Sequence, residues 1–261
     1  MELEIVGRCL AAPIGGACSG YAIHTEQGSV LLDCGPGILE RLWARGLVEH
    51  LDAVIVSHMH QDHFLDLVPL SNMVSQDALR RVRRDQGRLP VHVPRGRGPE
   101  ILSAVALALG DQPTRFADAF DLREYDGGET LTLGSLEITF ARTAHPEPCF
   151  APRVSDGSTT LVYGADGAVS AELEAHARGA DLLLVEATFA DPGPELERHG
   201  HMTGEQAGEL AHRAGVGRLV LTHLSPWIEG QDAENRHRAA NRFGGPVDLA
   251  TEGLRLAVSS R

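Results

Sequence analysis

The chain has 261 residues, of which 43% are apolar, enough to build a sizeable buried core. All 23 basic residues are Arg, and the absence of Lys excludes a Schiff base, a pyridoxal phosphate anchor and a phosphate-loop lysine. The formal charge of -13 argues against non-specific binding to nucleic acid or anionic membranes, because such binding needs an extended cationic surface. The 13 His outnumber Phe, Tyr and Trp combined, which favours metal or acid-base chemistry.

Short β-type runs alternate with helical patterns along the chain. Strands are expected at 3–7, 20–25 and 29–34, a helix at 38–47, and a buried strand at 53–57. Helical patterns cover 65–85 and 101–109, and 131–142 is typical of a hairpin. Later strands are expected at 159–163, 181–185 and 218–222, with helices at 170–178, 203–214 and 233–243. This alternation predicts a layered α/β fold in a single domain, 1–261.

The expected cellular setting follows from what the sequence lacks. The four Cys show no Cys-x-x-Cys spacing, so we expect reduced thiols. The first residues have no cationic stretch followed by an apolar core, and no apolar run approaches the ~18 residues that indicate a membrane span. We therefore expect a soluble, cytoplasmic protein that does not bind membranes.

The strongest chemical signal is a histidine cluster directly after the buried strand at 53–57. Residues 57–63 read Ser-His-Met-His-Gln-Asp-His, which places His58, His60, Asp62 and His63 within six residues. Adjacent Asp62 and His63 project differently from His58 and His60, so the four cannot all bind one tetrahedral ion. Two neighbouring metal ions would accommodate them.

This segment resembles the H-x-H-x-D-H motif of the metallo-β-lactamase superfamily, and the resemblance continues along the whole chain. His145 in TAHPEP is similar to the family's third motif, Asp166 in YGADG to its metal-bridging carboxylate, and His223 in LTHLS to its last ligand. The resemblance implies an αββα sandwich. Ala165 and Gly167 depart from the usual Gly-Asp-Thr around Asp166, so the usual Thr hydroxyl is lost while the ligand remains.

The resemblance also implies a metal-ligand set for two divalent ions. One ion would be held by His58, His60 and His145, the other by Asp62, His63 and His223, with Asp166 and a hydroxide shared between them. Zinc is the expected metal, although Mn²⁺ or Fe²⁺ also suits His and Asp donors. Two divalent ions outweigh two carboxylates and a hydroxide by one charge, so a small anionic substrate can be attracted to an acidic protein.

Residues 185–227 are similar to the ribonuclease Z branch of the superfamily. There a Glu-Ala-Thr segment and a later His-x-Thr form an accessory pair, and the matching residues here are Glu186 and His201. The resemblance implies that Glu186 orients His201 to protonate the departing oxygen, so Asp62, Glu186 and His201 are the candidate catalytic residues. His199 is an alternative partner. A capped strand end at Glu186 and a polar helix start at His201 are the structural alternatives.

Substrate size is constrained by what the chain does not contain. Long-armed ribonuclease Z inserts an RNA-binding arm between its third and fourth motifs, whereas only 21 positions separate His145 from Asp166. The one basic run, 80–84, is typical of a solvated helix face, so a large nucleic acid is disfavoured. Leu221 to Trp227 resembles the closing motif of relatives that hydrolyse cyclic nucleotides, although Pro226 and Trp227 also suit simple packing.

The sequence therefore predicts a two-metal phosphodiesterase for small cyclic or linear phosphodiesters. With no Lys, substrate phosphate must meet metals, backbone amides or Arg, and Arg153 is a candidate, its alternative being an exposed strand charge. A lactonase or thioesterase, a ribonuclease Z-like RNA 3'-end processing enzyme and a non-catalytic metal-binding member of a biosynthetic pathway remain open. The branch resemblance also implies a homodimer.

Overall fold

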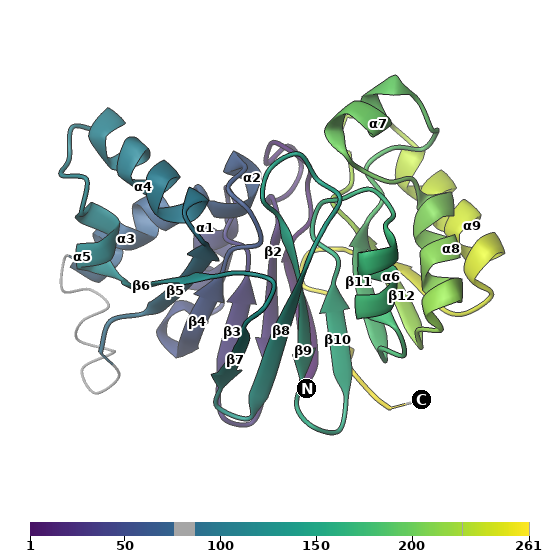
Figure 1. Ribbon diagram of the computed structural model, residues 1–261, viewed down its shortest axis with the longest axis horizontal. Helices are drawn as coiled ribbons and strands as arrows, with labels where there is room; N and C mark the ends of the chain where they lie inside the picture. The colour runs from purple at the N-terminus through teal and green to yellow at the C-terminus, as the bar shows by residue number, and fades with distance from the viewer. Residues whose placement is uncertain (76–86, 226, 261) are drawn as a thin grey trace.

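Two seven-stranded mixed sheets lie face to face with helices on both outer surfaces (Figure 1). This computed structural model describes residues 1–75, 87–225 and 227–260. The first sheet has the order β14-β1-β2-β3-β4-β5-β6, and the second has the order β13-β12-β11-β10-β9-β8-β7. The predicted αββα sandwich is thereby confirmed.

The first sheet and its helices come mainly from the N-terminal half. Its strands are β1 (Glu2–Gly7), β2 (Gly20–His24), β3 (Ser29–Leu32), β4 (Leu51–Ile55), β5 (Pro90–Pro94), β6 (Asp121–Tyr125) and β14 (Arg255–Ala257). The helices of this half are α1 (Ile38–Ala44), the 3-10 turn Val48–His50, α2 (Gln61–Phe64), α3 (Leu67–Ser75), α4 (Arg97–Ala108) and α5 (Arg115–Ala119). Apolar side chains of these helices and of the outer sheet face form one buried core.

The second sheet and its helices come from the C-terminal half. Its strands are β7 (Thr130–Leu133), β8 (Leu136–Arg142), β9 (Phe150–Ser155), β10 (Thr160–Tyr163), β11 (Leu182–Glu186), β12 (Arg218–Thr222) and β13 (Val247–Leu249). The helices are α6 (Ala171–Ala177), α7 (Pro194–His199), α8 (Gly204–Ala214) and α9 (Gln231–Phe243). A second core fills the space between the sheets, and a third lies between this sheet and α6, α8 and α9.

Local sequence signals explain several of these boundaries. All five residues of β11 are buried, as expected for a near-continuous apolar run in a parallel part of a sheet. Helix α8 begins at a capping box formed by Thr203 and Gln206 and ends at Gly215, whose φ of 61° suits glycine. Gly208 lets α8 pack closely on α9, because a Cβ there would lie 2.4 Å from the Ala239 carbonyl oxygen.

Strand direction decides where the functional residues collect. Strands β3 to β6 run parallel, as do β10 to β13 in the other sheet. Strand β8 points the same way as β10, because both are antiparallel to β9. The segments that follow β3, β4, β8, β10, β11 and β12 therefore meet at one edge of the sandwich, the upper edge in Figure 1.

The structure differs from the predicted elements in a few places. Strand β5 was not predicted, because Pro90 and Pro94 bound it and Pro disfavours strand interiors. Strand β6 was also missed, since Arg123 and Glu124 are exposed on an edge strand. The helix expected at 65–85 ends its described part at Ser75, and the remainder, including the basic run 80–84, lies outside the described residues, as does Pro226. The four Cys, which were expected to be reduced, are free, and all four are buried.

No helix in the described part of the chain has the length and apolar character needed to cross a bilayer.

Candidate metal centre

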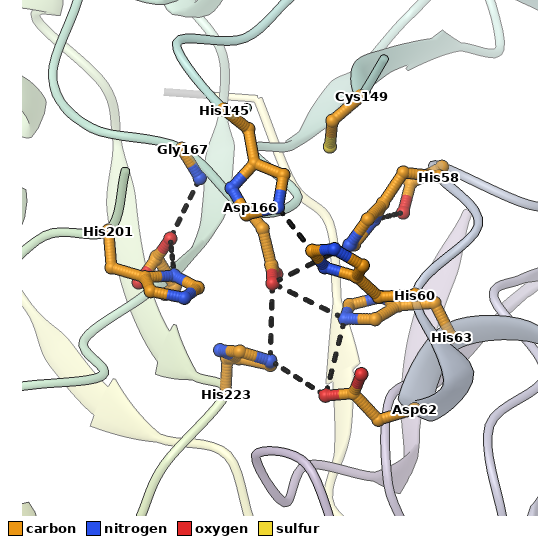
Figure 2. A network of polar contacts seen from close by, with 12 residues as sticks. His58, His60, Asp62, His63, His145, Cys149, Asp166, Gly167, His201 and His223 are labelled. Carbon is orange, nitrogen blue, oxygen red and sulfur yellow. Dashed lines mark hydrogen bonds and ion pairs between the residues drawn. The ribbon is translucent and has the colours of Figure 1, made fainter. Parts of the chain in front are cut away.

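The segments that follow four strands bring all seven candidate metal ligands into one cluster. The segment after β4 and helix α2 supplies four of them, and single residues after β8, β10 and β12 supply the rest (Figure 2). The cluster consists of His58, His60, Asp62, His63, His145, Asp166 and His223. His60 is exposed and the other six are buried, so the cluster opens to solvent on the side of His60.

Two groups of donor atoms correspond to those that the resemblance implied, and a third joins Asp166, His201 and His223. Ligand atoms of His58, His60, His145 and Asp166 lie within 4.8 Å of one another, and so do those of Asp62, His63 and His223. Four donors at 2.0–2.1 Å around a tetrahedral zinc ion would stand about 3.3 Å apart. His60 Nδ1 and His145 Nε2 are 3.2 Å apart, and His223 Nε2 is 3.2 Å from Asp62 Oδ2 and 3.3 Å from Asp166 Oδ2.

Three buried polar atoms of the cluster have no hydrogen-bond partner among the described residues. They are His58 Nε2, His63 Nε2 and Asp166 Oδ1. A buried donor or acceptor without a partner costs about 1–3 kcal/mol, and three at one point need an explanation. A divalent cation supplies one, because it accepts lone pairs from imidazole and carboxylate donors at once. The residues present therefore fit such an ion.

On the side of the first sheet, the buried carboxylate of Asp33 orients the histidines. His63 Nδ1 donates to Asp33 Oδ2 at 2.7 Å, which turns His63 Nε2 toward the cluster. The Ser57 hydroxyl donates to the same oxygen at 2.9 Å and so accepts from His58 Nδ1 at 3.1 Å. Tyr163 and the Ser57 amide also donate to this carboxylate. Asp33 thus fixes the tautomers of one histidine in each donor group.

On the side of the second sheet, two further histidines are oriented in the same way. His145 Nδ1 donates to the Gly200 carbonyl oxygen at 3.3 Å. His223 Nδ1 donates to the Thr188 hydroxyl at 2.9 Å. In both residues Nε2 is left as an unprotonated donor atom that faces the cluster.

Both carboxylates of the cluster are held in the ionised form. Burial alone would raise the pKa of Asp62, but His63 and His223 bring it below its usual range. Burial likewise opposes ionisation of Asp166, but His223 and His63 hold its pKa well below the ordinary value. Each therefore offers an anionic oxygen, as a cation site requires.

Backbone strain is concentrated at this centre. Among the described residues, the non-glycine residues with positive φ are Ala11 (56°), Asp33 (60°), Ala165 (50°) and His223 (52°). The Ala11 amide donates to Asp62 Oδ2 at 2.8 Å, and Ala165 directly precedes Asp166. Left-handed backbone costs about 1–2 kcal/mol at such residues and persists where the surroundings impose it. The strain at Ala165 also explains why Gly suits this position better.

Glu186 and His201, which the resemblance paired, lie in contact beside the cluster. His201 Nδ1 donates to Glu186 Oε1 at 3.0 Å, and the His201 ring centroid lies 5.4 Å from that of His145 and 5.5 Å from that of His223 (Figure 2). Burial alone lowers the pKa of His201, but the Glu186 carboxylate raises it to about 9. His199, the alternative partner, is an exposed residue at the end of α7.

Arg153 is not brought to the cluster. Its guanidinium lies at the C-terminal end of α6, where Nη1 donates to the carbonyl oxygen of His176 at 2.7 Å and, at 3.4 Å, to that of Arg178. These carbonyls end a helix and lack intrahelical partners, so a cation there completes the helix end. The structure thus places Arg153 in a structural contact.

Sequence reasoning missed the residues that orient the ligands. Asp33 ends a run of apolar strand residues, and a lone carboxylate at that position was a usable signal. Ser57 gave no such signal, because single hydroxyl residues beside functional residues are common. Thr188 lies in the Glu-Ala-Thr segment, but the resemblance assigned no role to its hydroxyl. Their roles emerge only from the contacts to His58 and His223.

Comparisons with known proteins agree with this geometry. A family model described as the beta-lactamase superfamily domain matches residues 29–224. The probable metallo-hydrolase YhfI of Bacillus subtilis is 33% identical over 97% of this chain and 98% of its own. The crystal structure of the YhfI protein has a TM-score of 0.83 at 31% identity and covers 98% of this chain and 99% of that one.

Two further proteins are similar. A ribonuclease Z of Mycobacterium bovis is 30% identical over 88% of each chain. A crystal structure of a diphosphatase from the PhnP family shares the fold with a TM-score of 0.75, at 18% identity over 98% of this chain and 97% of that one. The chain therefore belongs to the beta-lactamase superfamily and is a metallo-hydrolase of that fold, with clustered His and Asp residues as its candidate metal ligands.

Proposed function

We propose that the protein is a metal-dependent phosphodiesterase that cleaves small phosphodiesters of the cyclic or linear nucleotide type. The observation that carries this proposal is the His201–Glu186 pair beside the metal cluster. Cleavage of a phosphodiester expels an alkoxide, which leaves more readily when an acid protonates it. An ester or thioester hydrolase of the same fold has less need of such an acid.

His201 is suited to this role by its hydrogen bonding. Its Nδ1 is engaged by Glu186, so Nε2 is the atom that would give a proton to the departing oxygen. His201 is nearly buried and stands against the rings of His145 and His223. The acid would therefore stand beside two of the candidate metal ligands.

The cluster would hold two divalent ions, zinc in the first instance and Mn²⁺ or Fe²⁺ as alternatives. His58, His60 and His145 would bind one ion, Asp62, His63 and His223 the other, and Asp166 both. Such ions lower the pKa of a water nucleophile and polarise the phosphoryl group. Their positive charge would draw a small anionic substrate to a chain whose formal charge is -13.

Hydrolysis assays test the proposal directly. The purified chain, loaded with Zn²⁺ or Mn²⁺, is assayed with bis-para-nitrophenyl phosphate and with 2',3'- and 3',5'-cyclic nucleotides. We expect turnover that a chelator abolishes and that His58→Ala lacks. Turnover no faster than that of His58→Ala on every phosphodiester would overturn the proposal, and hydrolysis of lactones or thioesters by the same samples would replace it.

One alternative has an observation in its favour. The similarity to a ribonuclease Z supports RNA 3'-end processing as a second candidate. It predicts a higher kcat/KM for a precursor transfer RNA than for any cyclic nucleotide, measured with the same enzyme. If the chain binds metal but hydrolyses neither substrate nor lactones, it is the non-catalytic metal-binding member.

We also propose a cytoplasmic homodimer. Light scattering on the purified chain gives its mass in solution, and a value near the 28.0 kDa of one chain would contradict the dimer. Fractionation of the source cells would test the compartment.

A further inference from the structure

We propose that Thr188 is a positioning residue for His223. By way of Thr188, Glu186 would then orient a candidate metal ligand as well as the candidate acid His201. The inference rests on the proposed function and deepens it. It assigns a role to the hydroxyl of the Thr that closes the Glu-Ala-Thr segment, which the family resemblance left without one.

The hydrogen bonds of Glu186 are the starting point. Its side chain is fully buried, and both oxygens are occupied. Oε1 accepts from the Gly167 amide at 2.8 Å and from His201 Nδ1 at 3.0 Å. Oε2 accepts from the Thr188 hydroxyl at 2.6 Å and from the Met202 amide at 3.2 Å. A buried carboxylate with four donors is pinned in place and can fix its partners in turn.

Thr188 passes this constraint on to a candidate ligand. Because its hydroxyl has one proton and gives it to Glu186, its oxygen must accept the proton of His223 Nδ1, 2.9 Å away. His223 is then held as the tautomer whose Nε2 faces Asp62 and Asp166, at 3.2 and 3.3 Å. His223 also has a left-handed φ of 52°, a backbone conformation that the surrounding contacts must hold in place.

Glu186 reaches the shared carboxylate by a second route. Glu186 accepts a hydrogen bond from the amide of Gly167, the residue that directly follows Asp166 in the chain. One carboxylate thus steadies the backbone beside Asp166, the imidazole of His223 and the imidazole of His201. Removal of Glu186 is therefore expected to weaken metal binding as well as proton transfer, whereas its loss in a simple acid pair would affect proton transfer alone.

Three substitutions separate these roles. Thr188→Val keeps the side-chain shape but removes the hydroxyl, and Thr188→Ser keeps the hydroxyl. His201→Asn places an amide N–H where Nδ1 was, so Glu186 keeps a donor while the Nε2 acid is lost. Thr159→Val is the matched control, because Thr159 is a buried threonine that hydrogen-bonds to Asp156 at the other end of β10.

The readout is metal affinity, measured on the full chain by competition between Zn²⁺ and a chromophoric chelator, and the absorption spectrum of the Co²⁺ form. Loss of an orienting contact typically costs 10–100-fold in metal affinity. We expect Thr188→Val to lose about 10-fold or more and to change the Co²⁺ spectrum. Thr188→Ser should bind close to the native affinity, and His201→Asn and Thr159→Val should match the native chain.

Each outcome decides the matter. If Thr188→Val binds Zn²⁺ as tightly as the native chain, or if Thr188→Ser fails to restore an affinity lost in Thr188→Val, the inference is wrong. Failure of the native chain to bind Zn²⁺ would instead contradict the proposed function. Thermal unfolding of the metal-free variants shows whether each variant still folds. If Thr188→Val does not fold, the comparison of Thr188→Ser with the native chain still tests the inference.

Discussion

Two buried carboxylates orient the side chains on the two sides of the candidate metal centre, and they differ in which side chains they orient. Asp33, after β3 in the first sheet, accepts four hydrogen bonds and orients only candidate ligands, His63 directly and His58 through a serine. Glu186, at the end of β11 in the second sheet, also accepts four, but one comes from His201. In the proposed function, the first sheet would therefore serve metal binding alone, whereas the second would couple metal binding to proton transfer.

The largest effect is expected where the two sides meet. Asp166 belongs to the first donor group and lies 3.3 Å from His223 of the second, so Asp166→Asn removes a charge that each ion would use. Since a bound ion contributes several kcal/mol to catalysis, we expect kcat/KM for bis-para-nitrophenyl phosphate to fall about 10³-fold. Metal content should fall with it. The control is Asp121→Asn, a half-buried aspartate paired with Arg123 on β6, and equal activity in both variants would refute the role of Asp166.

The next effect separates the two carboxylates. Asp33→Asn tolerates the left-handed backbone but cannot accept all four hydrogen bonds, so we expect up to about 100-fold weaker metal binding. Because Asp33 does not touch His201, the variant should keep the native preference between good and poor leaving groups. Glu186→Gln should change both properties. Chelator competition measures the metal affinity, and rates on substrates with good and poor leaving groups measure the preference. Identical behaviour of the two variants would show that Asp33 and Glu186 do not differ in role.

How far the sequence predicts this centre follows from the same contrast. The ligands at 58–63 are contiguous, and their spacing after a buried strand indicates a metal site without any knowledge of the fold. His145, Asp166 and His223 stand alone, so only the family resemblance marked them. Asp33 and Thr188 act through tertiary contacts, and no local pattern encodes those. Arg153 was proposed for substrate because charge is visible in a sequence whereas the carbonyls it meets are not.

A difference in acid stability is expected away from the cluster, in the first sheet. His92 on β5 is buried, and neither ring nitrogen has a hydrogen-bond partner among the described residues. Burial lowers the pKa of His92 to about 4, so the folded chain keeps it neutral while the unfolded chain binds a proton below about pH 6.5. Stability therefore falls as the pH drops from 6.5 toward 4.

Replacing this imidazole tests that account. Protonation of His92 in the unfolded chain is expected to lower the free energy of unfolding by about 2 kcal/mol between pH 7 and pH 5. This loss should be absent in His92→Leu. Urea unfolding of the metal-free proteins at pH 7 and pH 5 gives the difference. Equal losses in the native chain and in His92→Leu would mean that His92 does not set the acid sensitivity.

The smallest effect concerns strain beside Asp166. Ala165 has a φ of 50°, which costs about 1–2 kcal/mol in an L-residue, whereas glycine adopts it freely. The greater entropy of glycine in the unfolded chain offsets about 0.5–1 kcal/mol of this gain. Ala165→Gly should therefore stabilise the chain by less than about 1 kcal/mol and raise Tm by ~2 °C. A lower Tm in calorimetry would show that the lost methyl packing outweighs the relieved strain.

The proposed role of His201, to protonate the leaving oxygen at a metal centre, is tested by one ratio of rates. His201→Asn and the native chain, both loaded with the same metal, are compared on two phosphodiesters. One is bis-para-nitrophenyl phosphate, and the other is a cyclic nucleotide, whose alkoxide is a far poorer leaving group than nitrophenolate. We predict nearly unchanged kcat on the nitrophenyl ester and a loss of about 10²–10⁴-fold on the cyclic nucleotide. Equal losses on both substrates would contradict the claim.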